Sequence, residues 1–270
     1  MRIWTRVFPL FVCVLFVGLA AGPTARAQDV SNVDLLKAFA GVALGSEYEK
    51  REPRILKWEK PVNAAIIGKG YPPLFEQLVV KQLADLAKET NHPVQLVYSE
   101  TMRREKRLPA NVSKIPINML IFYAPKADLP AMVEKHTKGA FKAPDVARMS
   151  NLGFCHGRLQ IFKSGALKFV YAAVPAEITT QVVYGNTRVD PKIFLRACVT
   201  EEITQLMGLI NDVKGLKISI FSDDSAHVDL TEADRWMLRL LYDPRVKAGM
   251  KPDEVLPLVA RMLLEKRPGK

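Results

Sequence analysis

The feature that most constrains the fold of this chain is a series of short apolar segments separated by one long amphipathic helix. After a short opening helix, "SNVDLLKAFAGVAL", the segment Val62–Ile67 alternates as a half-buried strand does. The segments "HPVQLVYSE" and "PINMLIFYAP" have the length and composition of two further strands. Between the first and second strands, "YPPLFEQLVVKQLADLAKETN" predicts a helix that starts at prolines and ends at Asn91. We therefore expect an α/β (α+β) domain with an N-terminal mixed sheet and a long helix.

The second half of the chain predicts a hairpin followed mainly by helices. In "CHGRLQIFKSGALKFVYAAVP" the turn "KSG" separates two strands. A helix capped by Asp190 should end at Gly208, another should begin at the cap Thr231, and a last helix should cover about residues 252–265. The segment 126–152 is polar and irregular, with a helix expected near residues 130–136. We predict a single domain over residues 28–270, with its core at about residues 50–245.

Residues 1–27 have the features of a secretory signal peptide. A basic start, "MRIWTR", precedes the apolar run "VFPLFVCVLFVGLAAG", and "ARA" places Ala25 and Ala27 where cleavage requires small residues. Cys13 lies in that run without the small residues that precede a lipid-modified cysteine. We expect a periplasmic or secreted protein with no transmembrane segment after cleavage. The alternative is that the apolar run stays in place as an uncleaved anchor.

The mature chain is basic. The predicted signal peptide holds three of the chain's 39 basic residues and none of its 28 acidic residues, so a formal charge of +8 remains. The densest basic segment, "RREKR" at residues 103–107, contains no aromatic residue on which a base could stack, and we expect a solvated loop there. Outside the cytoplasm the available polyanions are envelope surfaces, and we keep such surfaces as a candidate partner. The sequence gives no indication of nucleic-acid binding.

Two cysteines remain in the mature chain, Cys155 and Cys198. An even number of cysteines in an oxidising compartment favours a disulfide, and two cysteines allow one intramolecular pairing. The alternative is a pair of buried thiols. We therefore expect a Cys155–Cys198 disulfide.

The stretch "TEEITQLMGLIND" places several polar residues on one face of the predicted helix. Residues four apart share a helix face, so Glu201 and Gln205 lie together, with Glu202 beside them. In the H-E-x-x-H motif of zinc peptidases the same spacing sets two zinc ligands around a glutamate that activates water. In this chain Glu201 and Gln205 occupy the two ligand positions, and Glu202 occupies the position of the general base.

The segment 196–242 resembles the C-terminal half of a matrixin-type metzincin. The longer metzincin motif adds a glycine at a sharp turn and then a third ligand, and these positions are Gly208 and Asn211 here. Such enzymes next carry a methionine beneath the metal, where this chain has Phe221 in "SIF", and they close with a helix such as "LTEADRWMLRLLYDP". The order of the predicted elements also suits that family. The resemblance implies a metzincin-like fold in which the zinc histidines are replaced.

Several stretches together are similar to an envelope protein family of Gram-negative bacteria, known as domain of unknown function 2927. They are "KWEKPVNAAIIG", the cysteine pair, "CVTEEITQLMGLIND", "SIFSDD" and "LLYDPRVKAGM". This resemblance implies the extent of the domain and a location in the cell envelope. It supplies no activity.

One carboxylate and two amides make a poor zinc site. Amides bind zinc less strongly than imidazole does, and this set would favour a harder ion such as calcium or magnesium, held weakly. We therefore expect no metal and no cofactor, with a weakly bound divalent cation as the alternative. We expect His156 to lie near the helix that carries Glu201, because the expected disulfide joins the preceding Cys155 to that helix. For it and for His92, His136 and His227 we expect structural or solvated roles.

The polar positions also have a structural interpretation. Glu201 and Gln205 can hydrogen-bond across one helical turn, while Asn211 and Asp212 can cap the turn that follows. Such a network would fill the space of a metal site. A metal-free pair of catalytic carboxylates is another alternative, but Glu201 and Glu202 are neighbours that point in different directions, instead of facing each other across a substrate.

We expect an exported protein without orthodox zinc peptidase activity. It would bind an extended peptide or another envelope component in a cleft between an edge strand and the predicted helix. That helix carries Glu201, Glu202 and Gln205, which we call the altered motif. One alternative is a metal-dependent hydrolase with Glu202 as general base and unusual ligands. Another is a basic structural protein that docks on anionic envelope surfaces.

Overall fold

The computed structural model describes residues 30–45, 51–152, 154–179, 182–184, 187–222 and 225–270. The predicted signal peptide lies outside these residues. The helices and strands follow one another in the order α1 (Asn32–Leu44), β1 (Val62–Ile67), α2 (Pro73–Thr90), β2 (Val94–Tyr98), α3 (Glu100–Arg104), a 3-10 turn (Val112–Lys114), β3 (Met119–Ala124), α4 (Leu129–His136), α5 (Ala143–Leu152), β4 (His156–Ile161), β5 (Leu167–Pro175), a 3-10 turn (Ala176–Thr179), β6 (Val182–Tyr184), β7 (Thr187–Val189), α6 (Pro191–Gln205), α7 (Glu232–Leu241) and α8 (Pro252–Lys266).

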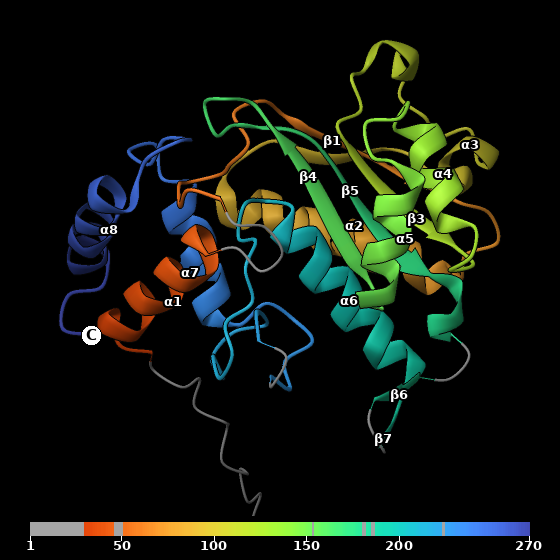
Figure 1. Cartoon of the computed structure of the whole chain (residues 1–270). Helices are drawn as coiled ribbons and strands as arrows, with labels where there is room; N and C mark the ends of the chain where they lie inside the picture. The colour runs from red at the N-terminus through yellow and green to blue at the C-terminus, as the bar shows by residue number, and fades with distance from the viewer. Residues whose placement is uncertain (1–29, 46–50, 153, 180–181, 185–186, 223–224) are drawn as a thin grey trace, which may run out of the picture.

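Five strands form one mixed sheet in the order β2-β1-β3-β5-β4 (Figure 1). Strand β1 pairs in parallel with β2 and β3, and β3 pairs in parallel with β5. Strand β4 runs antiparallel to β5, as the predicted hairpin requires. The expected mixed α/β class is confirmed, and β2 and β4 are the two edge strands of this sheet.

Helices cover both faces of the sheet. Along β3 and β5 alternate side chains point to opposite faces, so Ile121 and Val170 belong to the core beneath α2 and α6, whereas Phe122 and Tyr171 belong to the core beneath α4 and α5. The larger core extends to α1, α7 and α8, which Figure 1 shows gathered on the left of the sheet. No helix in the described part of the chain is long and apolar enough to cross a membrane.

Local signals predicted most of these elements. Strand β1 has the predicted bounds, and α2 ends where Asn91 takes a left-handed conformation, with φ of 50°. The expectation of an irregular segment after residue 136 was wrong, because α5 lies there; it is a polar helix that buries Val146 and Met149. The basic segment at residues 103–107 is also not wholly a loop, since its first two residues end α3.

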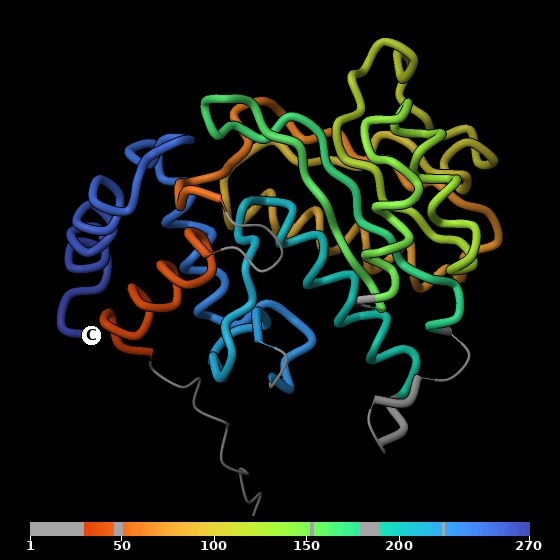
Figure 2. The backbone as a smooth tube through the Cα atoms, viewed as in Figure 1, coloured from red at the N-terminus to blue at the C-terminus, as the bar shows by residue number. Residues whose placement is uncertain are grey.

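The first and last helices of the described chain lie side by side, α1 in red and α8 in blue (Figures 1 and 2). The buried Asn32 side chain donates a hydrogen bond from Nδ2 to the carbonyl of Arg267, at 3.1 Å. In return the Arg267 guanidinium donates to the carbonyl of Val30, at 2.8 Å. These contacts join the two ends of the domain.

Candidate functional site

Helix α6 begins as the sequence predicts. The carboxylate of Asp190 accepts a hydrogen bond from the backbone N–H of Lys192 at 2.8 Å, and Pro191 occupies the first turn. The helix packs against α2 on one side and against β4 and β5 on the other. Its regular hydrogen bonding ends at Gln205, and a short turn continues to Gly208. The helix thus presents the altered motif beside the edge strand β4.

The three polar residues of the motif differ in exposure. Glu202 is buried, while Glu201 and Gln205 are half-buried. Gly157 of β4 makes room for Glu202, because a Cβ atom at Gly157 would lie 3.2 Å from Glu202 Oε2 and 3.1 Å from the Leu206 side chain. The candidate general base is therefore packed on the backbone of the edge strand.

His156 lies on the opposite face of that strand. In the antiparallel register His156 is opposite Ala173, which belongs to the core beneath α4 and α5, whereas Gly157 faces α6. The His156 ring makes an edge-on contact with Tyr171, with the centroids 5.9 Å apart. The sheet backbone therefore separates His156 from Glu202. His156 is close to α6 by its position along β4, as expected, but its side chain lies on the other face of the sheet and does not share a site with Glu202.

The His156 imidazole is a buried neutral group. Neither ring nitrogen has a hydrogen-bond partner among the described residues. Burial lowers the pKa of His156 to about 4, with smaller contributions from the charges of Arg158 and Lys126. The ring is thus a packing group at neutral pH, in agreement with the structural role expected for it.

The predicted disulfide is confirmed. Cys155 and Cys198 are bonded, with their Cα atoms 5.9 Å apart and a sequence separation of 43 positions. Cys155 directly precedes β4, and Cys198 lies one helical turn before Glu202 in α6. The bond therefore fixes the edge strand to the helix that carries the altered motif.

The turn after α6 is held by two aromatic side chains that the sequence did not single out. Trp58 donates from Nε1 to the carbonyl of Leu206, and Tyr242 donates from its hydroxyl to the carbonyl of Met207, both at 2.9 Å. Gly208 then turns the chain with φ of 111°, and a Cβ atom there would lie 2.0 Å from the carbonyl oxygen of Leu56. Trp58 and Tyr242 stand in stretches quoted for the family resemblance, but no local signal indicated their partners.

The remaining ligand-equivalent positions point in different directions. Gln205 donates from Nε2 to Oδ1 of Asp212 at 3.0 Å. Asn211 donates from Nδ2 to the carbonyl of Gly41 in α1, also at 3.0 Å. The structure therefore brings Gln205 and Asp212 together and directs Asn211 to another helix. Within the described residues, no three His, Cys, Asp or Glu residues are grouped so that they could hold a metal ion.

Phe221, at the position equivalent to the methionine of the resemblance, is fully buried in the core. Beside it, Ser219 donates from Oγ to the buried carboxylate of Asp234, at 2.5 Å. Thr231 and the backbone N–H of Ile220 also donate to Asp234. Burial raises the pKa of Asp234 despite these bonds. The segment is thus a hydrogen-bonded support for α7.

The other three histidines have separate structural surroundings. A ring nitrogen of His92 lies 2.8 Å from the carbonyl oxygen of Lys60, and one of His227 lies 3.1 Å from that of Lys217. His136 contacts Phe122 edge-on. These positions agree with the structural roles expected for them.

The outer side of β4 is bordered by exposed apolar side chains. Phe154 and Phe162 flank the strand and are 37% and 42% exposed. Phe154 makes an edge-on contact with Phe194 of α6, with ring centroids 5.4 Å apart, and the neighbouring Ile193 is 50% exposed. An edge strand with aromatic side chains at both ends offers main-chain hydrogen bonds and apolar contacts to an extended partner.

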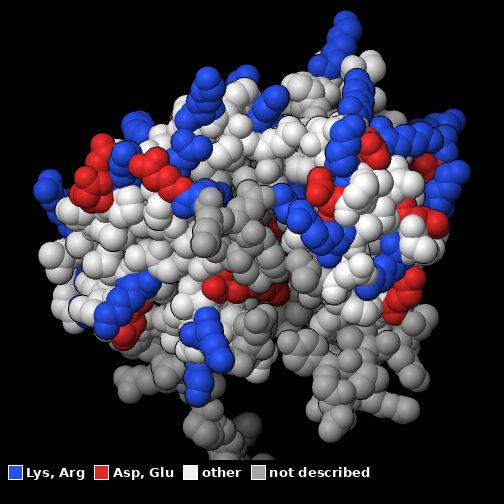
Figure 3. All heavy atoms as spheres, viewed as in Figure 1, with Lys and Arg blue, Asp and Glu red and all other residues white. Residues whose placement is uncertain are grey.

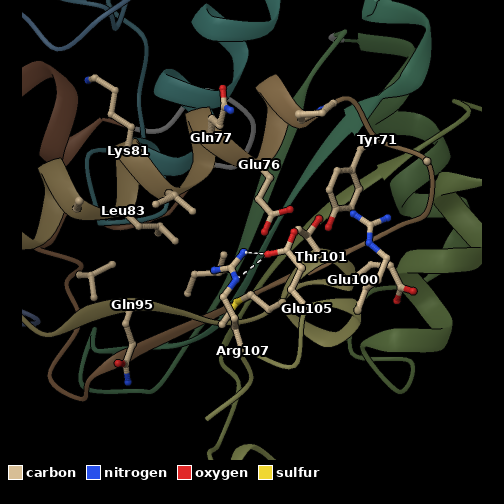
Figure 4. Close-up of a pocket in the computed structure, with 18 residues that line it drawn as sticks. Tyr71, Glu76, Gln77, Lys81, Leu83, Gln95, Glu100, Thr101, Glu105 and Arg107 are labelled. Atoms are coloured by element: carbon tan, nitrogen blue, oxygen red, sulfur yellow. Dashed lines mark hydrogen bonds and ion pairs between the residues drawn. The ribbon is translucent and has the colours of Figure 1, made fainter.

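A groove of about 970 Å³ lies beside the other edge strand, β2. Its floor contains apolar residues from α2 and β2, among them Leu83 and Val94. Figure 4 shows Gln77 and Lys81 on the α2 side, and Glu105 and Arg107 joined on the opposite side. Lys81 also pairs with Asp85. The charges at the rim of this groove therefore largely neutralise one another.

Charged side chains are unevenly spread over the face shown in Figure 3. Carboxylates gather in a recess near its centre, in the area where α6 and the following loop lie in Figure 1, and Lys and Arg dominate the upper and right-hand rim. Glu201 of the altered motif and Asp212, which follows that motif in sequence, are both half-buried. On this face the basic side chains thus lie mainly at the rim.

The sequence model of a family described as "Protein of unknown function (DUF2927)" matches residues 32–261. Comparison with curated proteins and with solved structures found no match. The family match extends from α1 into α8 and so includes both sheet edges, the disulfide and the altered motif.

Proposed function

The chain belongs to the DUF2927 family, whose function is unknown, and we propose that it binds an extended segment of polypeptide along β4 without hydrolysing it. The observation that carries the proposal is the edge strand itself. Strand β4 is covalently fixed to α6 beside the altered motif, and Phe154 and Phe162 are exposed at its two ends. An added strand would pair with the outer main-chain groups of β4 and rest its side chains on these rings.

We also propose that the fold is metzincin-like. The order of a strand, a long helix, two strands, a hairpin and then α6 is the order that the resemblance implies. Gly208 stands at a sharp turn directly after α6, which supports its equivalence to the turning glycine of the metzincin motif. In metzincins the edge strand holds substrate by main-chain pairing, so this fold would supply a peptide-binding edge without a metal.

The contacts of the motif favour binding over hydrolysis. Glu202 packs on Gly157, Gln205 bonds to Asp212, and Asn211 bonds to α1. A hydrolase with Glu202 as general base would need these groups to rearrange around a metal and a water molecule. Docking on an anionic surface through residues 103–107 is also less favoured, since Arg103 and Arg107 pair with Glu100 and Glu105.

We place the protein outside the cytoplasm, in the periplasm or secreted. The Cys155–Cys198 disulfide supports this location, because such bonds persist in oxidising compartments and are rare in the cytosol of most organisms. The predicted signal peptide at residues 1–27 is the second support. A polypeptide partner would then be another component of the envelope.

The test uses a random eight-residue peptide library displayed on phage, selected against the mature protein with its disulfide intact. Selected peptides should shift the backbone amide NMR signals of β4. Their affinity should fall at least about ten-fold in Phe154→Ser and Phe162→Ser, which remove the exposed apolar contacts. Val80→Ser is the matched control, because Val80 is 47% exposed beside the β2 groove.

Other outcomes would select other functions. If the selected peptides shift the amide NMR signals of β2 and bind Val80→Ser less tightly, the binding site lies at the opposite sheet edge. Cleavage of the peptides on addition of zinc or calcium, lost in Glu202→Gln, would establish the hydrolase. Failure to select any peptide, together with salt-sensitive binding to anionic vesicles, would support surface docking.

A further inference from the structure

A second, smaller cavity lies away from β4, where three stretches distant in sequence meet. Its volume is about 260 Å³, and it is lined by residues 57–59, 90–92, 242, 244 and 246–248. We call it the Lys57 cavity. Its walls come from the segment before β1, the end of α2 and the turn after α7, so it is formed by the tertiary fold and not by one loop.

Lys57 is held firmly in the wall of this cavity. Its carbonyl accepts a hydrogen bond from the backbone N–H of Leu167 at 2.9 Å. Its side chain is 8% exposed, and Nζ donates to the carbonyl of Val246 at 3.0 Å. The same amino group lies 5.0 Å from the centre of the Tyr242 ring. The geometry of the amine is therefore fixed by two neutral groups.

Among the residues that the structure describes, Lys57 has no paired counter-ion in this cavity. Within the described residues Lys57 forms no ion pair, and the nearby carboxylate of Asp243 is already paired with Arg245 and Lys266. Buried lysines normally have a partner of opposite charge. Burial, together with the positive charge of Lys247, lowers the pKa of Lys57 to about 8. The amine is thus mostly charged at neutral pH, and within the described part of the chain it lacks the partner that a buried cation requires.

We propose that the Lys57 cavity binds a small oxyanion, a carboxylate or phosphate group, between Lys57 and Lys247. Both lysines line the cavity, Lys57 from its wall and the exposed Lys247 from its mouth. An oxyanion would accept from the free N–H positions of Lys57 and supply the missing charge. The titratable or charged groups that face the amine or the cavity are Lys247, Glu59, His92, Tyr242 and Asp243.

Two of these groups set the limits of the site. Glu59 is exposed at the rim and opposes an anion, so affinity depends on Lys57 and Lys247 together. Burial lowers the pKa of His92, so its imidazole adds little positive charge at pH 7. Binding requires the protonated form of Lys57, and affinity should therefore fall as the pH rises above 8. This inference does not rest on peptide binding at β4.

The experiment titrates the mature protein with sodium phosphate, sodium acetate or sodium chloride at constant ionic strength. The pKa of Lys57 is followed by NMR of the amine, and thermal unfolding is measured in parallel. We expect phosphate or acetate, but not chloride, to raise both the pKa of Lys57 and the Tm. A response to phosphate only, or to acetate only, identifies which group the cavity accepts.

Variants separate the cavity from general charge effects. Lys57→Met should reduce affinity for the effective anion at least about ten-fold, Lys247→Met should reduce it less, and the exposed control Lys214→Met should leave it unchanged. Equal responses in Lys57→Met and the wild type would overturn the proposal, as would an unchanged pKa of Lys57 in both anions. If Lys57→Met does not fold, the wild-type pKa titration decides the question.

Discussion

The two edges of the central sheet are built in contrasting ways. Strand β4 is antiparallel, is joined to α6 by a disulfide, and ends in exposed phenylalanines. Strand β2 is parallel, has no such staple, and is bordered by a groove whose rim carries paired charges such as Glu105 with Arg107. Charged side chains at an edge discourage pairing with another chain. One edge is thus bordered by paired charges, whereas the other is fixed to a helix by the disulfide and lies between exposed aromatic side chains.

The largest effect should come from removing the staple of the β4 edge. In Cys155→Ala/Cys198→Ala the unfolded chain regains the freedom of a loop of 43 residues, which corresponds to about 4 kcal/mol of unfolding free energy. Urea unfolding measures this loss, and peptide affinity at β4 should fall with it. The backbone amide NMR signals of the residues that line the β2 groove should stay unchanged. A loss below about 1 kcal/mol would mean that packing, not the bond, fixes β4 to α6.

The second largest effect should be a loss of stability in acid that arises from His156 in β4. The pKa of this ring is about 4 when folded and near 6.5 when unfolded, so the unfolded chain takes up a proton at a pH where the folded chain does not. The contribution of His156 to the free energy of unfolding is fully present above pH 6.5. It is lost as the pH falls towards 4, and the loss amounts to about 3 kcal/mol. Urea unfolding at several pH values measures it.

The matched variants for that titration are His156→Phe and His92→Gln. Because neither His156 nitrogen is bonded within the described chain, phenylalanine should preserve stability at pH 7 and flatten the loss between pH 6.5 and 4. His92, which precedes β2 and is half-buried, should change the profile less. An unchanged profile in His156→Phe would assign the acid sensitivity to other groups.

Two glycines with positive φ, one after α6 and one beside the β2 groove, should respond differently to substitution by alanine. Gly208→Ala should cost about 3 kcal/mol, because φ is 111° and the new Cβ would collide with the Leu56 carbonyl. Gly70, which lines the β2 groove, also has a positive φ, of 68°, but has no neighbouring atom within 4 Å of an added Cβ. Gly70→Ala should therefore cost about 1 kcal/mol. Equal costs in thermal unfolding would show that the turn after α6 can relax.

The smallest effect should arise at the rim of the β2 groove. Arg107 and Glu105 are both exposed, so Arg107→Ala should change the unfolding free energy by less than about 0.5 kcal/mol. Peptide affinity at β4 should also stay unchanged. A double-mutant cycle with Glu105→Ala measures the pair directly, and a coupling above about 1 kcal/mol would mean that this rim is more rigid than its exposure implies.

Local signals in the sequence predicted β1, the bounds of α2, the cap of α6 and the disulfide, because each depends on neighbouring residues or on a single possible pairing. Helix α5 was missed because its sequence is polar. The candidate site was harder to predict. Strand register decides that His156 turns away from Glu202, and a contact 170 residues away in sequence decides that Asn211 turns towards Gly41.

The side-by-side packing of α1 and α8 has a consequence for the order of events during synthesis. Asn32 finds its partner only after Arg267 has been added, 235 residues later. Contacts between such distant residues carry a large loop-closure cost and form late. Until then α1, whose Leu35 and Phe39 are buried in the folded domain, lacks its contacts with α8. A growing chain of this protein therefore cannot complete this packing until the last turn of α8 has been synthesised.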